Sequence, residues 1–432
     1  MLRKGTSLIL MMALLVSVLS AGVTTVPDDN SPTGYTTTFT YTDPDATNVR
    51  LVGSFTFYHN NDMHVFARGA AVSSVNDSPD NYVYGPESWA KGVDMRHIAD
   101  ESGSFDMVKE GDTWTVSLQL PCASYLYTYR VSYDNGATEV IVTDPENVPP
   151  QNAWSMNPQQ RSQFFVPYDA EKQNPWDDWT FLFPIEDESK KGEIVYIEYD
   201  RADGSKGPAQ VYLPAGYDAS RPEPYKTLYI SHGSGGFEGD WFHQGNVNNI
   251  ADRLIADGKV EPFIIVSVEN AVFVSSTGGT GFKAIAEDME DHLIPYIEEN
   301  FNVVKDASGR AMCGLSRGSQ ITSYLFLRET QLFDYYAMLS GGSCNLYSLD
   351  TDPAVLQSVN VYLGAGFSDQ ALLRPGEFDV MTQSSTMGFS WLLDDLGVDY
   401  NGKGSINIVP GAHDWFVWPQ LVLDYFTNYL WK

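Results

Sequence analysis

Hydrophobic and polar residues alternate in short runs over the first third of the chain, as they do in β-strands that bury one face. The clearest runs are Thr36–Tyr41, Val49–Phe57, Thr113–Leu120, Tyr125–Tyr133 and Val140–Thr143. The last two flank Asp134-Asn135-Gly136, which is a strong β-hairpin signal. Because helical spacing is almost absent, the pattern predicts an all-β sandwich over residues 34–168, with residues 60–104 as a long insertion.

The pattern changes after residues 169–191, a segment rich in proline and acidic residues that predicts a linker. From Gly192 onward, apolar runs of strand length alternate with helical spacing. The predicted strands are Ile194–Tyr199, Ala209–Leu213, Thr227–Ser231, Phe263–Val268, Arg310–Cys313, Tyr336–Leu339, Val359–Leu363 and Ile406–Val409, and the predicted helices are Asn246–Asp257, Ala284–Phe301, Arg317–Leu327, Thr386–Leu396 and Trp418–Leu430. This order predicts a second domain over residues 192–432, with helices on both faces of a mostly parallel sheet.

The first residues have the pattern of an export signal. Arg3 and Lys4 precede the 12-residue apolar run Leu8–Leu19, and the small residues Ser20 to Gly22 follow it. The run is shorter than the ~20 residues of a membrane span, which makes a membrane anchor the weaker alternative. We therefore expect a signal peptide over residues 1–21 and a secreted protein that is not membrane-bound after cleavage.

Composition narrows the function classes. The 432 residues include 26 Lys and Arg against 56 Asp and Glu, a net charge of −30, which argues against nucleic acid or an anionic membrane as a partner. Aromatic residues make up 13% of the chain, a content that suits stacking on sugar or phenolic rings.

The three cysteines, Cys122, Cys313 and Cys344, lack CxxC or zinc-type spacing, so we expect neither a metal site nor a redox pair. We expect all three to be buried thiols, with a Cys313–Cys344 disulfide as the alternative.

A candidate nucleophile stands in Gly314-Leu315-Ser316-Arg317-Gly318, where a predicted strand meets a predicted helix. This is the context of a nucleophile elbow, a turn so sharp that small residues are needed two positions before and after the serine. The motif by itself is weak, because a glycine-flanked turn serine has the same form. Its position between strand and helix favours Ser316 as a nucleophile.

A serine nucleophile needs a base and an acid, which follow it in the order Ser, Asp or Glu, His in hydrolases of this architecture. His413 is the only histidine after Ser316, and it follows a predicted strand. The favoured acid is Asp369, in the loop after strand Val359–Leu363. The alternatives are Glu377 and Asp379, the helical Asp394 and Asp395, and Asp414, which adjoins the base in sequence.

The glycine-rich segment His232-Gly233-Ser234-Gly235-Gly236 follows strand Thr227–Ser231. It lacks the spacing and the GK[ST] ending of phosphate-binding loops. We assign it to the oxyanion hole, with the backbone N–H groups of Ser234 and Arg317 as donors.

These residues resemble esterase D-type carbohydrate esterases of family one, which include many feruloyl and acetylxylan esterases. The resemblance rests on blocks that occur in family order: His232–Gly236 with Trp241, Leu254–Lys259 with Pro262–Val266, Leu293–Glu298, Gly314–Gly318, and Gly411–Trp415 with Trp418. It covers about residues 192–432 and implies an α/β-hydrolase fold, the triad Ser316, Asp369 and His413, and no cofactor. We place His232, Gly233, Trp241 and Trp415 among the substrate-binding residues.

The N-terminal region resembles the early-set, glycogen-binding-like immunoglobulin-type modules that precede some of these esterases. Val52–Phe55, Trp114, Tyr127–Tyr129 and Asp144–Asn147 carry this likeness. Trp89 and Tyr82–Tyr84 are candidate sugar platforms, with packing as the alternative. Relatives often have Met where this chain has Arg317, a departure that bears on acyl specificity more than on hydrolysis.

The sequence thus predicts a secreted serine esterase acting on feruloyl or acetyl esters of plant cell-wall xylan. Two alternatives stay open: a siderophore trilactone esterase, and a glycan-binding protein with an inert hydrolase domain.

Overall fold

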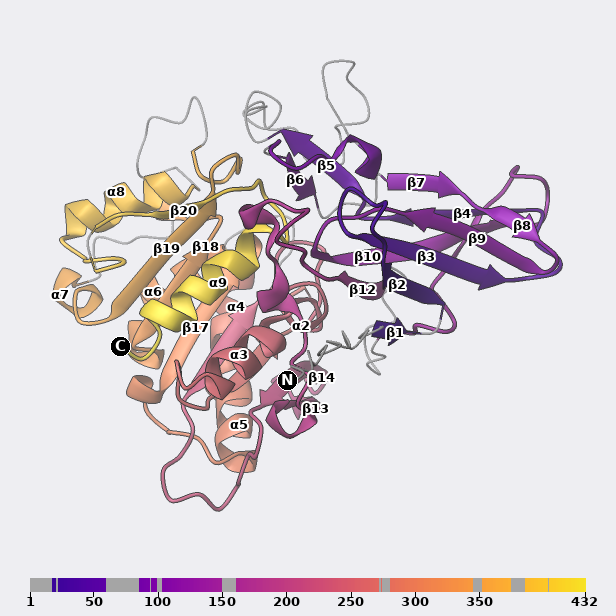
Figure 1. Ribbon diagram of the computed structural model, residues 1–432. Coiled ribbons are helices and arrows are strands. Elements are labelled where there is room, and N and C mark those ends of the chain that lie inside the picture. Colours follow the sequence, from indigo (N-terminus) through magenta and orange to yellow (C-terminus); the bar gives the residue numbers. More distant parts are fainter. Residues whose placement is uncertain are drawn as a thin grey trace, which may run out of the picture.

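The computed structural model describes residues 18–20, 22–59, 85–93, 95–98, 103–149, 161–271, 273, 280–344, 352–373, 385–402 and 404–432. It has an all-β lobe and a larger α/β lobe that lie side by side (Figure 1). Most of the expected signal peptide lies outside the described residues, but residues 18–20 form strand β1.

The described part of the β lobe contains two larger antiparallel sheets and a two-stranded one. One has the order β1-β2-β3-β9-β8: Val18–Ser20, Val23–Pro27, Tyr35–Thr42, Thr113–Leu118 and Val108–Glu110. The other has the order β11-β10-β4-β7, with β12 also on β10: Val140–Val142, Ala123–Ser132, Asn48–Gly53, Gly103–Asp106 and Ser162–Val166. The sheet-rich character predicted from alternation is present. The lobe begins earlier than residue 34, because β2 pairs with β3 along its whole length.

Aromatic side chains fill the space between these sheets. The Phe39 ring of β3 lies 5.1 Å from both Tyr127 of β10 and Phe164 of β12. The predicted strand Val49–Phe57 is interrupted at Ser54, and its second half forms β5 (Thr56–His59), which pairs with β6 (Met95–Ile98).

Of the candidate sugar-binding residues in the long insertion, the structure describes only Trp89. Trp89 is 3% exposed and belongs to the hydrophobic core, so the packing alternative holds for it. Tyr82–Tyr84 lie outside the described residues.

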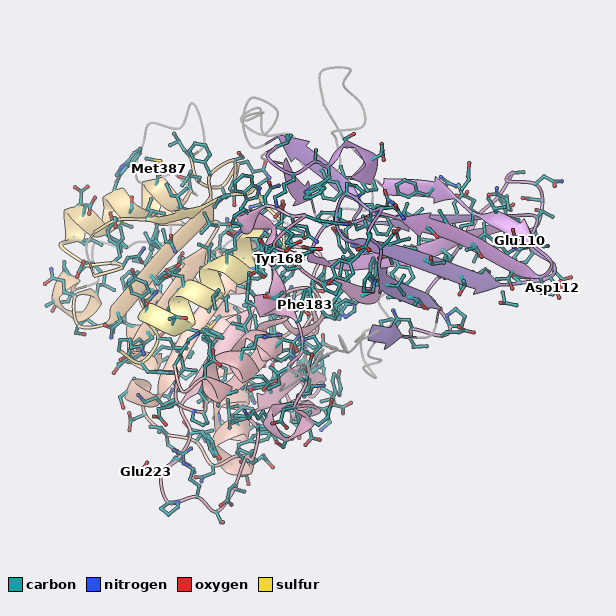
Figure 2. All side chains as sticks on the ribbon, viewed as in Figure 1. Glu110, Asp112, Tyr168, Phe183, Glu223 and Met387 are labelled. Carbon is teal, nitrogen blue, oxygen red and sulfur yellow. The ribbon has the colours of Figure 1, made fainter. Side chains whose placement is uncertain are left out.

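The linker is an ordered junction between the lobes. Residues 169–191 contain three short 3₁₀ turns, Pro175–Asp177, Thr180–Leu182 and Glu188–Lys190. The buried Trp179 ring lies 4.8 Å from Phe416 of the α/β lobe, and the Phe183 ring lies 5.0 Å from Phe165 of β12. Figure 2 labels Tyr168 and Phe183 at this junction.

The α/β lobe is built on one eight-stranded sheet with the order β13-β14-β16-β15-β17-β18-β19-β20. Strand β13 pairs antiparallel with β14, β14 pairs antiparallel with β16, and the remaining pairs are parallel. The strands are Glu193–Asp200, Lys206–Leu213, Ile264–Val268, Thr227–Ser231, Arg310–Leu315, Tyr335–Leu339, Asn360–Gly366 and Asn407–Val409, in that spatial order. The mostly parallel sheet expected from the sequence is therefore present.

Helices cover both faces of this sheet. Residues of α3 (Val247–Ala256) and α9 (Val417–Asn428) belong to one core cluster, which is continuous with the core of the β lobe. Residues of α4 (Thr280–Asp288), α5 (Ile294–Asn300), α6 (Arg317–Arg328) and α8 (Thr386–Leu396) belong to the other. Two shorter helices, α2 (Asp240–His243) and α7 (Pro353–Leu356), were not predicted. No helix in the described part of the chain is long and apolar enough to cross a membrane.

The predicted helix Ala284–Phe301 is divided. A π-helical turn, Met289–Leu293, separates α4 from α5. Pro295 lies in the first turn of α5, and since it has no N–H it cannot donate to the carbonyl of residue 291.

The cysteines are buried free thiols, as expected. Cys313 belongs to one core cluster and Cys344 to the other, so the alternative disulfide is not formed.

Candidate active site

Ser316 occupies a strained turn between β17 and α6. Its backbone has φ 50° and ψ −110°, a conformation that L-residues rarely adopt. A Cβ on Gly314 would lie 2.3 Å from the Gly318 carbonyl carbon, and a Cβ on Gly318 would lie 2.3 Å from the Ser231 carbonyl oxygen. Both glycines are therefore required by close backbone contacts, as the elbow motif predicts.

The structure brings Ser316, His413 and Asp369 together. The Oγ of Ser316 lies 2.9 Å from Nε2 of His413, and Nδ1 of His413 lies 2.9 Å from Oδ1 of Asp369. Asp369 is 5% exposed, and its Oδ1 also accepts the Ala371 N–H. This chain of hydrogen bonds positions the imidazole as a base for the hydroxyl.

The other candidate acids do not take this position. Glu377 and Asp379 lie outside the described residues, and Asp394 and Asp395 belong to α8. Asp414 is buried, and its Oδ1 accepts the Phe416 N–H at 2.9 Å. Burial, with Asp369 nearby, raises the pKa of Asp414 to about 7.

The glycine-rich segment after β15 lies against the nucleophile. A Cβ on Gly233 would lie 3.3 Å from the Cβ of Ser316, which places the backbone of this segment beside the reacting oxygen. Ser234 is exposed, while Arg317 provides the first N–H of α6. The first N–H groups of a helix lack intrahelical acceptors, so the Arg317 N–H suits an oxyanion.

The structure contradicts the prediction that His232 binds substrate. The His232 side chain is fully buried and cannot contact a substrate. Its Nδ1 donates to the Gly233 carbonyl at 2.8 Å, and the Asn270 N–H donates to its Nε2 at 3.3 Å. The imidazole therefore supports the segment from behind.

The prediction that Trp241 binds substrate is also wrong. This side chain is also fully buried, and its ring meets Trp415 edge to face at 5.2 Å. Trp415 is half-buried and meets Trp418, whose ring in turn lies 5.3 Å from His413. Of the two tryptophans expected to bind substrate, only Trp415 keeps an exposed surface.

Arg317 is half-buried, and its guanidinium lies over the Phe282 ring at 5.7 Å. Its side chain is thus engaged with α4 on one side of the elbow.

Sequence reasoning missed two supporting residues. Asn270 donates through Nδ2 to Ser231 Oγ at 2.6 Å and to the His232 carbonyl at 2.9 Å. Ser340, with φ 54°, lies 2.9 Å from Nε1 of Trp418. Both follow the carboxyl end of a strand, where polar residues gather in this fold, and this position is the signal that would have singled them out.

Two curated relatives align with part of the chain. An endo-1,4-beta-xylanase/feruloyl esterase of Xylanibacter ruminicola is 40% identical over 160 residues, 35% of this chain and 22% of that protein. Endo-1,4-beta-xylanase Y of Acetivibrio thermocellus is 27% identical over 161 residues, 35% of this chain and 14% of that protein. The chain thus spans less than a quarter of the length of either.

Among solved structures, a ferulic acid esterase is 22% identical with a TM-score of 0.47, covering 55% of this chain and 97% of that one. The enterobactin esterase FES of Shigella flexneri is 14% identical with a TM-score of 0.46, covering 90% of this chain and 92% of that one. The family model described as a putative esterase matches residues 202–424, just over half of the chain. The chain belongs to this esterase family.

Proposed function

We propose that the protein is a serine esterase that hydrolyses carboxylic esters through an acyl-enzyme. The observation that carries the proposal is the hydrogen-bonded series Ser316, His413 and Asp369 at a strained strand-to-helix turn. An inert relative has no need to keep all three groups in register.

In this mechanism Ser316 Oγ attacks the ester carbonyl while Nε2 of His413 takes its proton. Asp369 orients the imidazole through Nδ1 and stabilises its positive charge. Collapse of the tetrahedral intermediate transfers that proton to the leaving alcohol and leaves an acyl group on Ser316. Water then attacks the acyl-enzyme, again with His413 as the base, and releases the acid.

The negative oxygen of each tetrahedral intermediate requires hydrogen-bond donors. We assign the N–H groups of Ser234 and Arg317, because Ser234 follows Gly233, whose backbone lies beside Ser316, and Arg317 directly follows the nucleophile. A single donor of this kind contributes ~3 kcal/mol to the stability of the transition state.

We further propose that the substrate is a feruloyl or acetyl ester of plant cell-wall xylan. The support is the 40% identical relative from Xylanibacter ruminicola, which is an endo-1,4-beta-xylanase/feruloyl esterase. The half-buried Trp415, whose ring meets Trp418, the neighbour of His413, offers an aromatic surface on which a phenolic or sugar ring can stack.

We also propose a fold family and a role for the N-terminal lobe, and secretion of the protein. The early-set, immunoglobulin-like assignment of the β lobe, a glycan-binding role for it, and secretion after removal of residues 1–21 rest on the sequence. A pair of facing antiparallel sheets is consistent with the first of these.

The test is release of ferulate and acetate from feruloylated arabinoxylan by the wild type and by Ser316→Ala. The proposal predicts that release is lost in Ser316→Ala. Ser319→Ala is the matched control, because it removes a serine hydroxyl from the first turn of α6, just after Ser316. The Oγ of Ser319 has no hydrogen-bond partner among the described residues.

If ferulate release is lost in Ser316→Ala and kept in Ser319→Ala, the result supports both the mechanism and the substrate. Acetate release alone keeps the mechanism and assigns acetylated xylan. If the wild type cleaves nitrophenyl acetate but releases neither product, the xylan assignment is wrong, and cleavage of a trilactone siderophore is the next assay. Activity retained in Ser316→Ala would overturn the mechanism.

A further inference from the structure

A cavity of about 360 Å³ lies where the two lobes meet, apart from Ser316 and His413. Its walls come from β12, the linker, the edge strand β13 and its neighbour β14, and the segment around α2 and α3. The lining residues include Phe165, Tyr196, Gln210, Phe242, His243 and Asn248. The volume lies within the range of small-molecule sites.

The walls combine aromatic rings with neutral amides. Among the described residues that line the cavity there is no Lys, Arg, Asp or Glu. Burial lowers the pKa of His243 to about 4, so this histidine is neutral near pH 7. A neutral ligand rich in hydroxyl groups fits such walls, because rings cover its apolar faces and amides bond to its hydroxyls.

Several polar groups at the cavity have no hydrogen-bond partner among the described residues. The amide of Gln210 makes no hydrogen bond to any residue that the structure describes. The Tyr196 hydroxyl and Asn248 Oδ1 are buried and also have no hydrogen-bond partner among the described residues. Unsatisfied buried groups cost free energy, so a ligand that bonds to them is stabilised.

Three other amides of the cavity are held by hydrogen bonds before any ligand arrives. Asn248 Nδ2 donates to Asn249 Oδ1 at 3.0 Å, and Asn249 Nδ2 donates to the Leu182 carbonyl at 2.8 Å. From the β lobe, Gln163 Nε2 donates to the His243 carbonyl at 2.7 Å. A site whose side chains are ordered in advance loses less entropy on binding.

The cavity is connected to the proposed active site through the sheet and α2. Tyr196, Gln210, Ser267, Ile230 and Cys313 form one row of paired residues across five strands, ending three positions before Ser316. Three strand spacings separate Gln210 from Cys313, roughly 14 Å.

Helix α2 has residues that face the glycine-rich segment and residues that line the cavity. Asp240 accepts the Phe237 N–H below the glycine-rich segment, whereas Phe242 and His243 line the cavity.

We propose that this inter-lobe cavity binds a neutral sugar unit of an oligosaccharide, as a saccharide site separate from the ester-cleaving site. The identity of the sugar chain, xylan, rests on the proposed function. The proposal that the cavity binds a sugar rests on the chemistry of its walls and on the Gln210 amide, which bonds to no described residue.

The test is isothermal titration of the full chain with xylohexaose. Gln210→Ala is expected to weaken binding about three- to tenfold, the loss expected for one hydrogen bond. The double variant Gln210→Ala/Asn248→Ala is expected to weaken it further. Trp176→Ala, which removes a 38% exposed ring of the linker outside the cavity, is the control and should bind as the wild type.

Two further measurements separate this proposal from the proposed function. Ser316→Ala should bind xylohexaose normally, and the cavity variants should cleave nitrophenyl acetate at the wild-type rate. Thermal unfolding checks that each variant is folded. Gln210→Ala remains informative if the double variant is not folded, because the Gln210 amide bonds to no residue that the structure describes.

No binding of xylohexaose by the wild type, or equal binding by the wild type and Gln210→Ala, would overturn the proposal. Binding that is lost in Ser316→Ala would also overturn it, because the sugar would then occupy the ester-cleaving site. If xylohexaose binding is weakened in Gln210→Ala while no ferulate or acetate is released from arabinoxylan, the cavity proposal stands and the substrate assignment fails.

Discussion

At the scale of single residues, two carboxylates lie close to His413 and only one of them is hydrogen-bonded to its Nδ1. Asp369 holds that position at 2.9 Å, whereas Asp414 bonds to a backbone N–H instead. We expect Asp369→Asn to lower kcat by roughly 10³–10⁴-fold, because an amide can present its N–H and fix the wrong tautomer. Steady-state hydrolysis of a nitrophenyl ester measures the effect.

Asp414→Asn is the matched control for this prediction, because it changes the same group one residue from His413. It should keep kcat within a few-fold of the wild type. A large loss in Asp414→Asn with little change in Asp369→Asn would show that the acid has been assigned to the wrong carboxylate.

Asp414 also predicts a pH dependence of stability. Burial, with the charge of Asp369, raises its pKa from 3.8 to about 7. Between these two values the folded protein keeps a proton that the unfolded chain has lost, so this group lowers the free energy of unfolding as pH rises from about 4 to 7. Above pH 7 its contribution is constant.

Thermal unfolding of the wild type and Asp414→Asn across pH 4 to 9 tests this sign. The amide still accepts the Phe416 N–H but does not titrate. The Tm of the variant minus that of the wild type should therefore increase up to about pH 7 and then level off. A difference that is independent of pH would contradict the raised pKa.

At the scale of elements, the sequence predicted the α/β lobe better than the β lobe. Strand Thr227–Ser231 and helix Thr386–Leu396 have the predicted bounds, because apolar periodicity and flanking polar residues fix both ends. Strand β12 was missed, since it follows a proline-rich stretch and its pairing with β10 is long-range. Sequence order also placed Asp369 and His413 in loops after strands, whereas it could not show that Trp241 and His232 are buried, which tertiary packing decides.

The elbow shows how elements constrain one another. A Cβ on Gly318 would lie 2.3 Å and 2.7 Å from the carbonyl oxygens of Ser231 and His232, which are backbone atoms that cannot rotate away. Gly318→Ala should therefore separate α6 from the end of β15, with a loss of about 1–3 kcal/mol in unfolding free energy and a lower kcat.

Ser323→Ala, on the same helix, is the control for this change. It removes only a local bond from Oγ to the Ser319 carbonyl. Chemical denaturation and nitrophenyl ester hydrolysis should show a clear deficit for Gly318→Ala alone, and equal deficits in the two variants would refute the close contact as the cause.

At the scale of the whole molecule, the two lobes share one hydrophobic core. The cluster that contains Phe39 and Tyr127 of the β lobe also contains α3 and α9 residues of the α/β lobe. Trp179 of the linker is part of this cluster, and its ring meets Phe416, three residues after His413. The junction therefore connects the stability of the β lobe to the loop that carries the proposed base.

This connection predicts unequal effects for two tryptophans of one linker. Trp179→Ala removes a side chain that is 8% exposed and should lower the unfolding free energy by about 3–5 kcal/mol. Trp176→Ala removes a 38% exposed ring and should cost much less. Trp179→Ala should also lower kcat, because Phe416 loses its packing partner beside the His413 loop. Denaturant unfolding and ester hydrolysis on both variants test this, and equal stability losses would mean that the linker does not join the two cores.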